Sequence, residues 1–277
     1  MRSLLIFLFA VVVLTSCEES IVLDVNQVQP KIVIEGLVTD KPGYQMVKVS
    51  RSVGFYTDGV TPRITNAVVT VTDDLGEQIV FTHNPRNHPD SSGIYLPATR
   101  FVGKVGRTYT LHVNADGQNF EASDDLLPVI SMDSLKYDIN EFQQEDPNEE
   151  GKIYELLMFA REPQNIKNFY LFKFYRNDSL TYFNDTDVYY SDDELLAENI
   201  NGATSPVYYG INDEAVVEVY SLSRVGYVYY NDLFSILNSD GGGMFGPIPA
   251  SPRTNLSNGA IGFFQVSAID ISSVKIE

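Results

Sequence analysis

Tryptophan is absent from the 277 residues of this chain, cysteine occurs once and histidine three times. A single cysteine excludes both an internal disulfide and a zinc site built on cysteines. Basic residues are also scarce, with 19 Lys and Arg against 37 Asp and Glu, so the formal net charge is −18. This charge excludes a nucleic-acid-binding surface made of basic side chains, because a polyanion would be repelled.

Apolar and aromatic residues, by contrast, are plentiful. Hydrophobic residues make up 44% of the chain, and it contains 17 tyrosines and 16 phenylalanines. A chain of this composition can bury a substantial core and is not a disordered acidic tail. Aromatic residues are also good strand formers, so the composition favours a mainly β protein.

The first seventeen residues have the features of an export signal. Arg2 is the only charged residue before position 18, and residues 4–14 are all apolar. A transmembrane helix needs about 20 apolar residues, so this shorter run is typical of a signal-peptide core. It ends in Leu-Thr-Ser-Cys at 14–17, which resembles the bacterial lipobox. The sequence therefore predicts a lipoprotein signal peptide at residues 1–16 and lipidation of Cys17 by acyl chains such as palmitate; an ordinary secretory signal is the alternative.

Two acidic residues, Glu18 and Glu19, directly follow Cys17. This pair resembles the surface-export signal of Bacteroidota lipoproteins, and the aspartate that marks inner-membrane retention is missing from the position after the cysteine. We expect an outer-membrane location with the protein facing outward, although a solvated linker would also explain the two acids. Residues 17–30 lack clear periodicity and are interpreted as a tether.

Residues 31–125 are predicted to form an immunoglobulin-like β-sandwich. Alternating β-branched segments are separated by turn signals at short intervals, with no helical period between them. The Asp-Gly pair at 116–117 is the preferred sequence of a type I′ hairpin turn. The expected strands are 31–35, 46–50, 67–72, 78–81, 109–113 and 119–122.

Residues 126–277 are predicted to form a second β-rich domain with one or two short helices. Long strands with aromatic faces are expected at 153–160, 169–175 and 215–222, and their nearly continuous apolar character indicates that both faces are covered. Apolar residues recur at helical spacing over 225–237 and stop at a glycine-rich segment. The acidic segment 141–150 is expected to be a loop. Final strands are expected at 260–268 and 269–276.

The chain offers few candidates for catalysis. No Gly-x-Ser-x-Gly sequence is present, and His112 lies in the middle of a predicted strand. His83, His88 and Asp90 could ligate a transition metal, but the prolines and the arginine among them favour a solvated loop. The Gly-x-Gly-x-x-Gly sequence at 241–246 follows a predicted helix instead of opening one, which argues against dinucleotide binding. We therefore expect neither a cofactor nor a metal, and no enzymatic activity.

Acid runs and tyrosines remain as possible binding groups. Residues 184–187 and 191–194 offer oxygen ligands of the type that calcium takes, yet neither has the spacing of a calcium loop, so solvated runs are favoured. Most tyrosines are expected in the core. The adjacent pairs at 189–190, 208–209 and 229–230 must each divide between two faces wherever they lie on strands.

Several segments resemble one protein family. They are the lipobox cysteine with its acids, residues 32–39, 66–76, 93–95, 106–111, 229–230 and 258–264. Together they are similar to a Bacteroidota outer-membrane lipoprotein family known as domain of unknown function 4249, over nearly the whole mature chain and weakly over about 130–210. These are turn and strand patterns, so they specify a fold more than an activity.

The resemblance implies a role at the cell surface. Members of this family look like outer-membrane lipoproteins that are often encoded beside TonB-dependent receptors. We therefore expect a non-enzymatic, lipid-anchored accessory or ligand-capture partner of such a receptor in nutrient uptake. A structural or adhesive surface module is the alternative.

Overall fold

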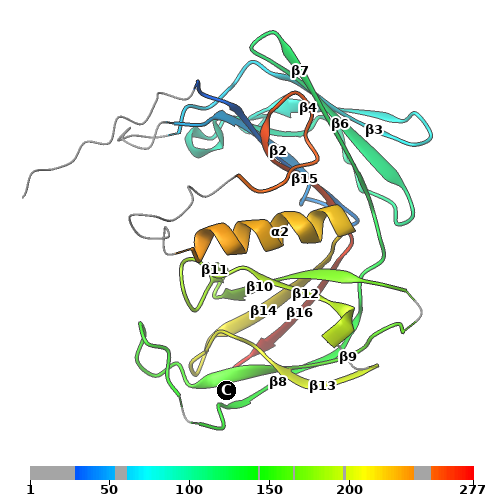
Figure 1. The fold of residues 1–277 in the computed structure, drawn as a ribbon. Helices are drawn as coiled ribbons and strands as arrows, with labels where there is room; N and C mark the ends of the chain where they lie inside the picture. Colours follow the sequence, from blue (N-terminus) through cyan, green and yellow to red (C-terminus); the bar gives the residue numbers. More distant parts are fainter. Residues whose placement is uncertain (1–28, 54–60, 143, 165, 196–197, 240–250) are drawn as a thin grey trace, which may run out of the picture.

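The computed structural model describes residues 29–53, 61–142, 144–164, 166–195, 198–239 and 251–277. The protein is mainly β, as predicted, and the described residues contain a single α-helix. Figure 1 shows one large curled sheet, then helix α2 (Arg224–Leu237), and then two smaller sheets on the far side of the helix.

The first sheet contains eight strands. Their order in the sheet is β15-β1-β2-β5-β4-β3-β6-β7. The bounds are β1 (Ile32–Thr39), β2 (Met46–Arg51), β3 (Val68–Asp73), β4 (Gln78–His83), β5 (Ile94–Pro97), β6 (Thr108–Ala115), β7 (Gln118–Asp125) and β15 (Ile261–Ser267), with a 3₁₀ turn at Pro89–Ser91 between β4 and β5. All six strands that we expected in this region are present.

This sheet curls until its two end strands meet. The backbone N–H of Val266 in β15 donates to the side chain of Asp124 in β7 over 3.0 Å. The sequence predicts a two-layered sandwich over 31–125, whereas the structure shows one hydrogen-bonded sheet that forms a near-barrel. It also recruits β15 from beyond residue 126, in parallel register with β1. Alternation along a strand reveals which face is buried but not which strand lies beside it, so this closure had no local signal.

The turns of the first sheet follow their sequences closely. Asp116 and Gly117 both have positive φ, at 53° and 74°, as the predicted type I′ turn between β6 and β7 requires. At the β3–β4 turn, a carboxylate oxygen of Asp73 accepts the N–H groups of Leu75 and Glu77. Inward-facing residues of these strands form a core that includes Ile34, Val47, Val71, Leu111 and Phe264, all fully buried.

The remaining strands form two sheets. One contains β10 (Phe169–Arg176), β11 (Ser179–Thr181), β12 (Tyr189–Asp192), β14 (Glu214–Ser221) and β16 (Ile269–Lys275). The other contains β8 (Met132–Ile139), β9 (Tyr154–Arg161) and β13 (Asn199–Thr204), and a second 3₁₀ turn spans Asp193–Leu195. Glu277 N–H donates to the Tyr137 hydroxyl over 3.1 Å, which places the end of β8 beside the chain after β16.

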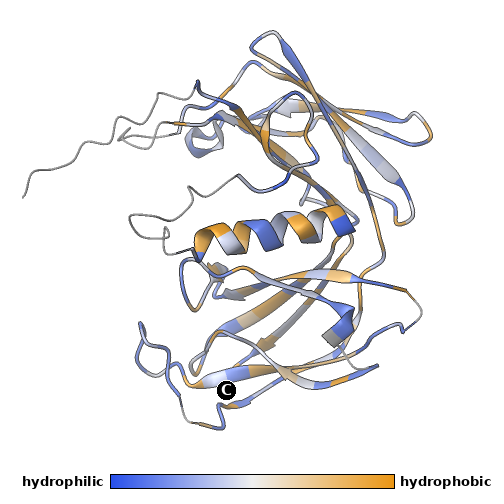
Figure 2. Cartoon of the chain, viewed as in Figure 1, coloured by the Kyte–Doolittle hydropathy of each residue, from blue (hydrophilic) through white to orange (hydrophobic). Residues whose placement is uncertain are grey.

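Strands β10 and β14 are covered on both faces, as their apolar sequences predict. On one face Tyr170, Phe174 and Val217 pack into a core shared with β9. On the other face Leu171 and Tyr220 pack with residues of α2 and of the first sheet. Helix α2 begins after Ser223, whose hydroxyl accepts the Gly226 N–H over 3.1 Å, and it ends at Leu237 as expected. Figure 2 shows apolar residues along the strands and along α2, with mostly hydrophilic loops.

Candidate functional site

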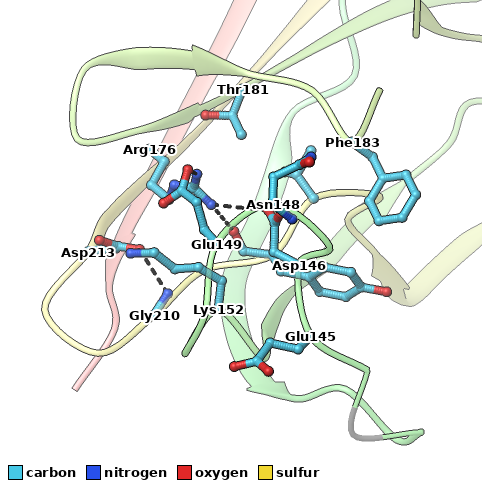
Figure 3. A network of polar contacts seen from close by, with 12 residues as sticks. Glu145, Asp146, Asn148, Glu149, Lys152, Arg176, Thr181, Phe183, Gly210 and Asp213 are labelled. Carbon is cyan, nitrogen blue, oxygen red and sulfur yellow. Dashed lines mark hydrogen bonds and ion pairs between the residues drawn. The ribbon is translucent and has the colours of Figure 1, made fainter. Parts of the chain in front are cut away.

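A polar network joins three loops, which are the β8–β9, β10–β11 and β13–β14 connections (Figure 3). Arg176, the last residue of β10, donates to the Tyr208 carbonyl over 2.9 Å. Its guanidinium also lies 3.5 Å from Asp146 Oδ2 and contacts the carboxylate of Glu149. The Arg176 side chain is 11% exposed and that of Asp146 is 7% exposed. Because arginine stays protonated, this pairing attaches the acidic loop 141–150 to the sheet.

A second ion pair supports the same loops from beneath. Lys152 Nζ lies 2.8 Å from Asp213 Oδ2, which also accepts the Gly210 N–H over 2.8 Å. The other oxygen of Asp213 accepts the side-chain amide of Asn177 over 2.8 Å. Burial alone would raise the pKa of Asp213, but these hydrogen bonds outweigh it and hold the pKa below its ordinary value. These ion pairs and hydrogen bonds connect the loops into one polar unit, the polar platform, which consists of Asp146, Glu149, Lys152, Arg176, Asn177 and Asp213.

Beside this platform the surface has an open hollow of about 420 Å³. Its lining is mostly carboxylates, amides and hydroxyls, with one guanidinium, one aliphatic side chain and one aromatic ring: Asp146, Asn148, Glu149, Arg176, Asn177, Ser179, Leu180, Thr181, Tyr182 and Asp185. The Arg176 charge is already engaged by two carboxylates, so the hollow offers hydrogen-bond acceptors and negative charge. Its chemistry suits a cationic or polar group.

A buried cluster of tyrosines surrounds Glu218 on β14. This carboxylate accepts the hydroxyls of Tyr44 over 2.6 Å and Tyr220 over 2.6 Å. It accepts a third hydroxyl from Tyr175 over 2.9 Å. Burial and the nearby carboxylate raise the pKa of Tyr44 to about 12. Because Tyr44 belongs to the β1–β2 connection, the cluster joins the first sheet to the second.

Lys173 contacts the same cluster through the ring of Tyr220. Its ammonium group sits 4.5 Å from the centre of the Tyr220 ring, a cation–π geometry. Burial lowers the pKa of Lys173, and the charge of Glu218 partly offsets this. Every phenol in the cluster donates to the carboxylate, so the arrangement is a structural tie between sheets.

A family model described as a domain of unknown function (DUF4249) matches residues 18–272. The chain belongs to this family. No curated protein matches the chain at a significant level. The family description assigns no activity, so the site of this DUF4249 protein has to be interpreted from its own residues.

Cys17 of this DUF4249 protein lies outside the described residues, so its lipidation stays a prediction. The glycine-rich segment 241–246 also lies outside the described residues, so the prediction that it binds no dinucleotide stays a prediction. Within the part of the chain that the structure describes, no helix is long and apolar enough to cross a membrane.

The three histidines all lie in the first sheet or its loops, far along the chain from the hollow. His83 Nε2 accepts the Gly93 N–H over 3.0 Å, while His88 Nδ1 accepts the Asp90 N–H over 3.3 Å. His112 is exposed on β6 and lies 3.3 Å from Glu121. Over the described ranges, no group of three or more His, Cys, Asp or Glu residues could hold a metal ion.

Three acids of the two runs bind protein donors. Asp187 accepts the Asn184 N–H over 2.9 Å and the Tyr189 hydroxyl over 3.1 Å. Asp193 accepts the Asn168 N–H over 2.7 Å, and Glu194 pairs with Lys167. These bonds close the turn at 184–187 and join 193–194 to the segment at 167–168, whereas Asp185 lines the hollow.

Six of the described tyrosines are buried and most of the others are half-buried, so fewer lie fully in the core than the sequence predicts. Among the residues buried most completely are Tyr95, Tyr109, Tyr170, Tyr209 and Tyr220. On β12 the adjacent pair divides as expected, with Tyr189 against Phe174 in one core and Tyr190 against Tyr227 of α2 in the other. The pairs at 208–209 and 229–230 lie off the strands, so alternation does not apply to them.

Sequence reasoning missed the hollow. Segment 141–150 is a loop as predicted, but nothing local indicates that Asp146 would be nearly buried against Arg176. The arginine lies 30 residues further along the chain at the end of a strand. A lone arginine at a strand end opposite a remote acidic loop is the only signal that the sequence contains.

Proposed function

We propose that this DUF4249 protein is a non-enzymatic lipoprotein, anchored to the outer membrane by acyl chains on Cys17 and facing outward. In this role it is an accessory partner of a TonB-dependent receptor in nutrient uptake. The observation that carries the proposal is the apolar run at 4–14 followed by Leu-Thr-Ser-Cys at 14–17. Burial of acyl chains contributes roughly 0.8 kcal/mol per CH₂, so two or three chains hold a protein at a membrane stably.

The polar platform supports a binding role over a catalytic one. The hollow is open, and its only cationic side chain, Arg176, is paired with two carboxylates. Its hydroxyl groups, those of Ser179, Thr181 and Tyr182, have no histidine beside them to act as a base. Acceptor-rich hollows of this kind hold a ligand or a partner through hydrogen bonds and charge.

The anchor is tested in the full-length chain with Cys17→Ala. The matched control is Ser16→Gly, which keeps a small residue before the cysteine. We expect the Ala variant to leave the outer-membrane fraction and the control to remain there, with mass spectrometry finding an acylated amino terminus in the control only. A Cys17→Ala protein that stays in the outer membrane as fully as the control overturns the anchor.

The partnership is tested by purification from mildly solubilised outer membrane. We expect a TonB-dependent receptor to co-purify with the wild-type protein, and deletion of the gene to impair growth on a nutrient that the receptor imports. Loss of adhesion with normal growth and no co-purified receptor would favour the adhesive alternative and refute the proposed role.

A further inference from the structure

Apolar side chains protrude from strand β11 and from the loops around the polar platform. Phe142 is 78% exposed, Ile211 is 60% exposed and Tyr182 is 42% exposed. Leu180, which also lines the hollow, is 40% exposed. Single exposed apolar residues are ordinary on a protein surface. Several on neighbouring loops, with polar groups between them, are typical of a protein-binding surface.

Hydrogen bonds hold the backbone beside two of these side chains, Phe142 and Ile211. Phe142 N–H donates to the Asn140 side chain over 3.1 Å, and the amide of Asn140 donates to buried Glu155 over 2.7 Å. Ile211 lies between Gly210 and Asp213, which accepts both the Gly210 N–H and Lys152. A surface that is ordered before binding loses less conformational entropy on association.

The same loops are strongly acidic. Segment 141–150 contains five acidic residues, and Asp185 also lines the hollow. The cations of the platform, Lys152 and Arg176, are both engaged in ion pairs. The net field at this end of the molecule is therefore negative, and it attracts a basic partner.

We infer that strand β11 with Leu180 and the loops carrying Phe142, Tyr182 and Ile211 form a docking surface for a protein segment that bears lysine or arginine beside an apolar side chain. A metal ion is a poorer fit, because Asp146 and Glu149 both face the Arg176 guanidinium. An anionic lipid surface is repelled by the acidic loops. This inference rests on the proposed function only for the identity of the partner, which would be the receptor.

Site-specific photo-crosslinking in cells tests the surface with the full-length protein. A photoreactive phenylalanine analogue is placed at position 142 or 211, and as a control at position 75, where Leu75 is 81% exposed on the first sheet. We expect crosslinks from 142 and 211 to one protein, through a peptide that contains lysine or arginine, and a yield from 75 lower by at least tenfold.

The double variant Phe142→Ser with Ile211→Ser gives an independent measurement. Both side chains are exposed, so the fold is expected to persist with an unchanged thermal midpoint. Yield of the crosslinked partner from an analogue placed at position 180 should fall at least tenfold, whereas Leu75→Ser should leave it unchanged. Raising the salt concentration should also lower the yield, since exposed charges are screened.

The outcomes separate this inference from the proposed function. Absence of crosslinks from 142 and 211, crosslinks to lipid only, or equal yields from position 75 overturn the docking surface, even if a receptor still co-purifies. Crosslinks to a basic peptide of a protein that is not a receptor support the docking surface and refute the proposed partner.

Discussion

Asp124 is expected to make the stability of the protein depend on pH in an unusual direction. Its side chain closes the first sheet by accepting the Val266 N–H over 3.0 Å, and the residue is only 7% exposed. Burial raises the pKa of Asp124 from 3.8 to about 6, although hydrogen bonds from Ser223 and Val266 oppose the rise. The folded protein thus keeps this proton over a range in which the unfolded chain has lost it.

The sign and size of the effect follow from this difference. Well below pH 3.8 both states are protonated, so Asp124 contributes no pH dependence there. Between pH 4 and pH 6 the folded state binds more protons than the unfolded state, so stability falls as pH rises. A difference of two pKa units corresponds to about 3 kcal/mol.

Asp124→Asn removes the ionisation and keeps an oxygen that can accept from Val266. The variant is expected to match the wild type near pH 4 and to be more stable by up to about 3 kcal/mol at pH 7. Urea unfolding of both proteins from pH 4 to pH 7 measures the difference, in which the effect of the other acids cancels. Asp125→Asn, at an exposed neighbouring position, is the control and should show little change. A difference for Asp124→Asn that is the same at both pH values would refute the reasoning.

Three further substitutions test other contacts by thermal and urea unfolding. Gly262→Ala adds a methyl group 2.1 Å from a β1 carbonyl oxygen at a φ of +103°, so β15 should detach at a cost of about 3 kcal/mol or more. Tyr44→Phe deprives buried Glu218 of one donor and should cost about 1–3 kcal/mol. Arg176→Gln leaves Asp146 without its cation and should cost about 3 kcal/mol, with faster proteolysis of segment 141–150.

Each of these variants has a control. Gly43→Ala is placed at a φ of +91° with open space around the added methyl group, so it reports backbone strain alone. Tyr182→Phe removes the hydroxyl of a side chain that is 42% exposed and that makes no hydrogen bond with the described residues, so it should change stability little. Arg176→Lys keeps the charge without the forked geometry. If any control costs as much as its partner variant, the specific contact is not the cause.

The local elements of this DUF4249 protein were largely predictable. In strand β6 every second residue is buried and the residues between them are half-buried or exposed, and the Asp-Gly turn after it directs the chain back into β7. Helix α2 was located from residues at three- and four-residue spacing, within one residue at its start. These features depend on neighbours within a few positions along the chain, so the sequence contains the information directly.

The arrangement of those elements was less predictable. Strand β15 pairs in parallel with β1, so residue 261 lies beside residue 33. That pairing is part of the near-barrel that stands in place of the expected sandwich. It also brings a strand from beyond residue 126 into the first sheet. The division into two domains at 125 and 126 stays a prediction. The hollow depends equally on distant partners, since Arg176 meets Asp146 and Tyr208 from three separate segments.

The sequence by itself determined the β character, the turns, the helix, the family and the predicted anchor at Cys17, because each depends on composition or on short-range pattern. Only the tertiary structure decided that Asp124 would be buried where the sheet closes, that Glu218 would collect three tyrosines, and that apolar and acidic loops would meet at one end. Burial and charge pairing are properties of surfaces brought together in space, and those surfaces exist only once the chain has folded.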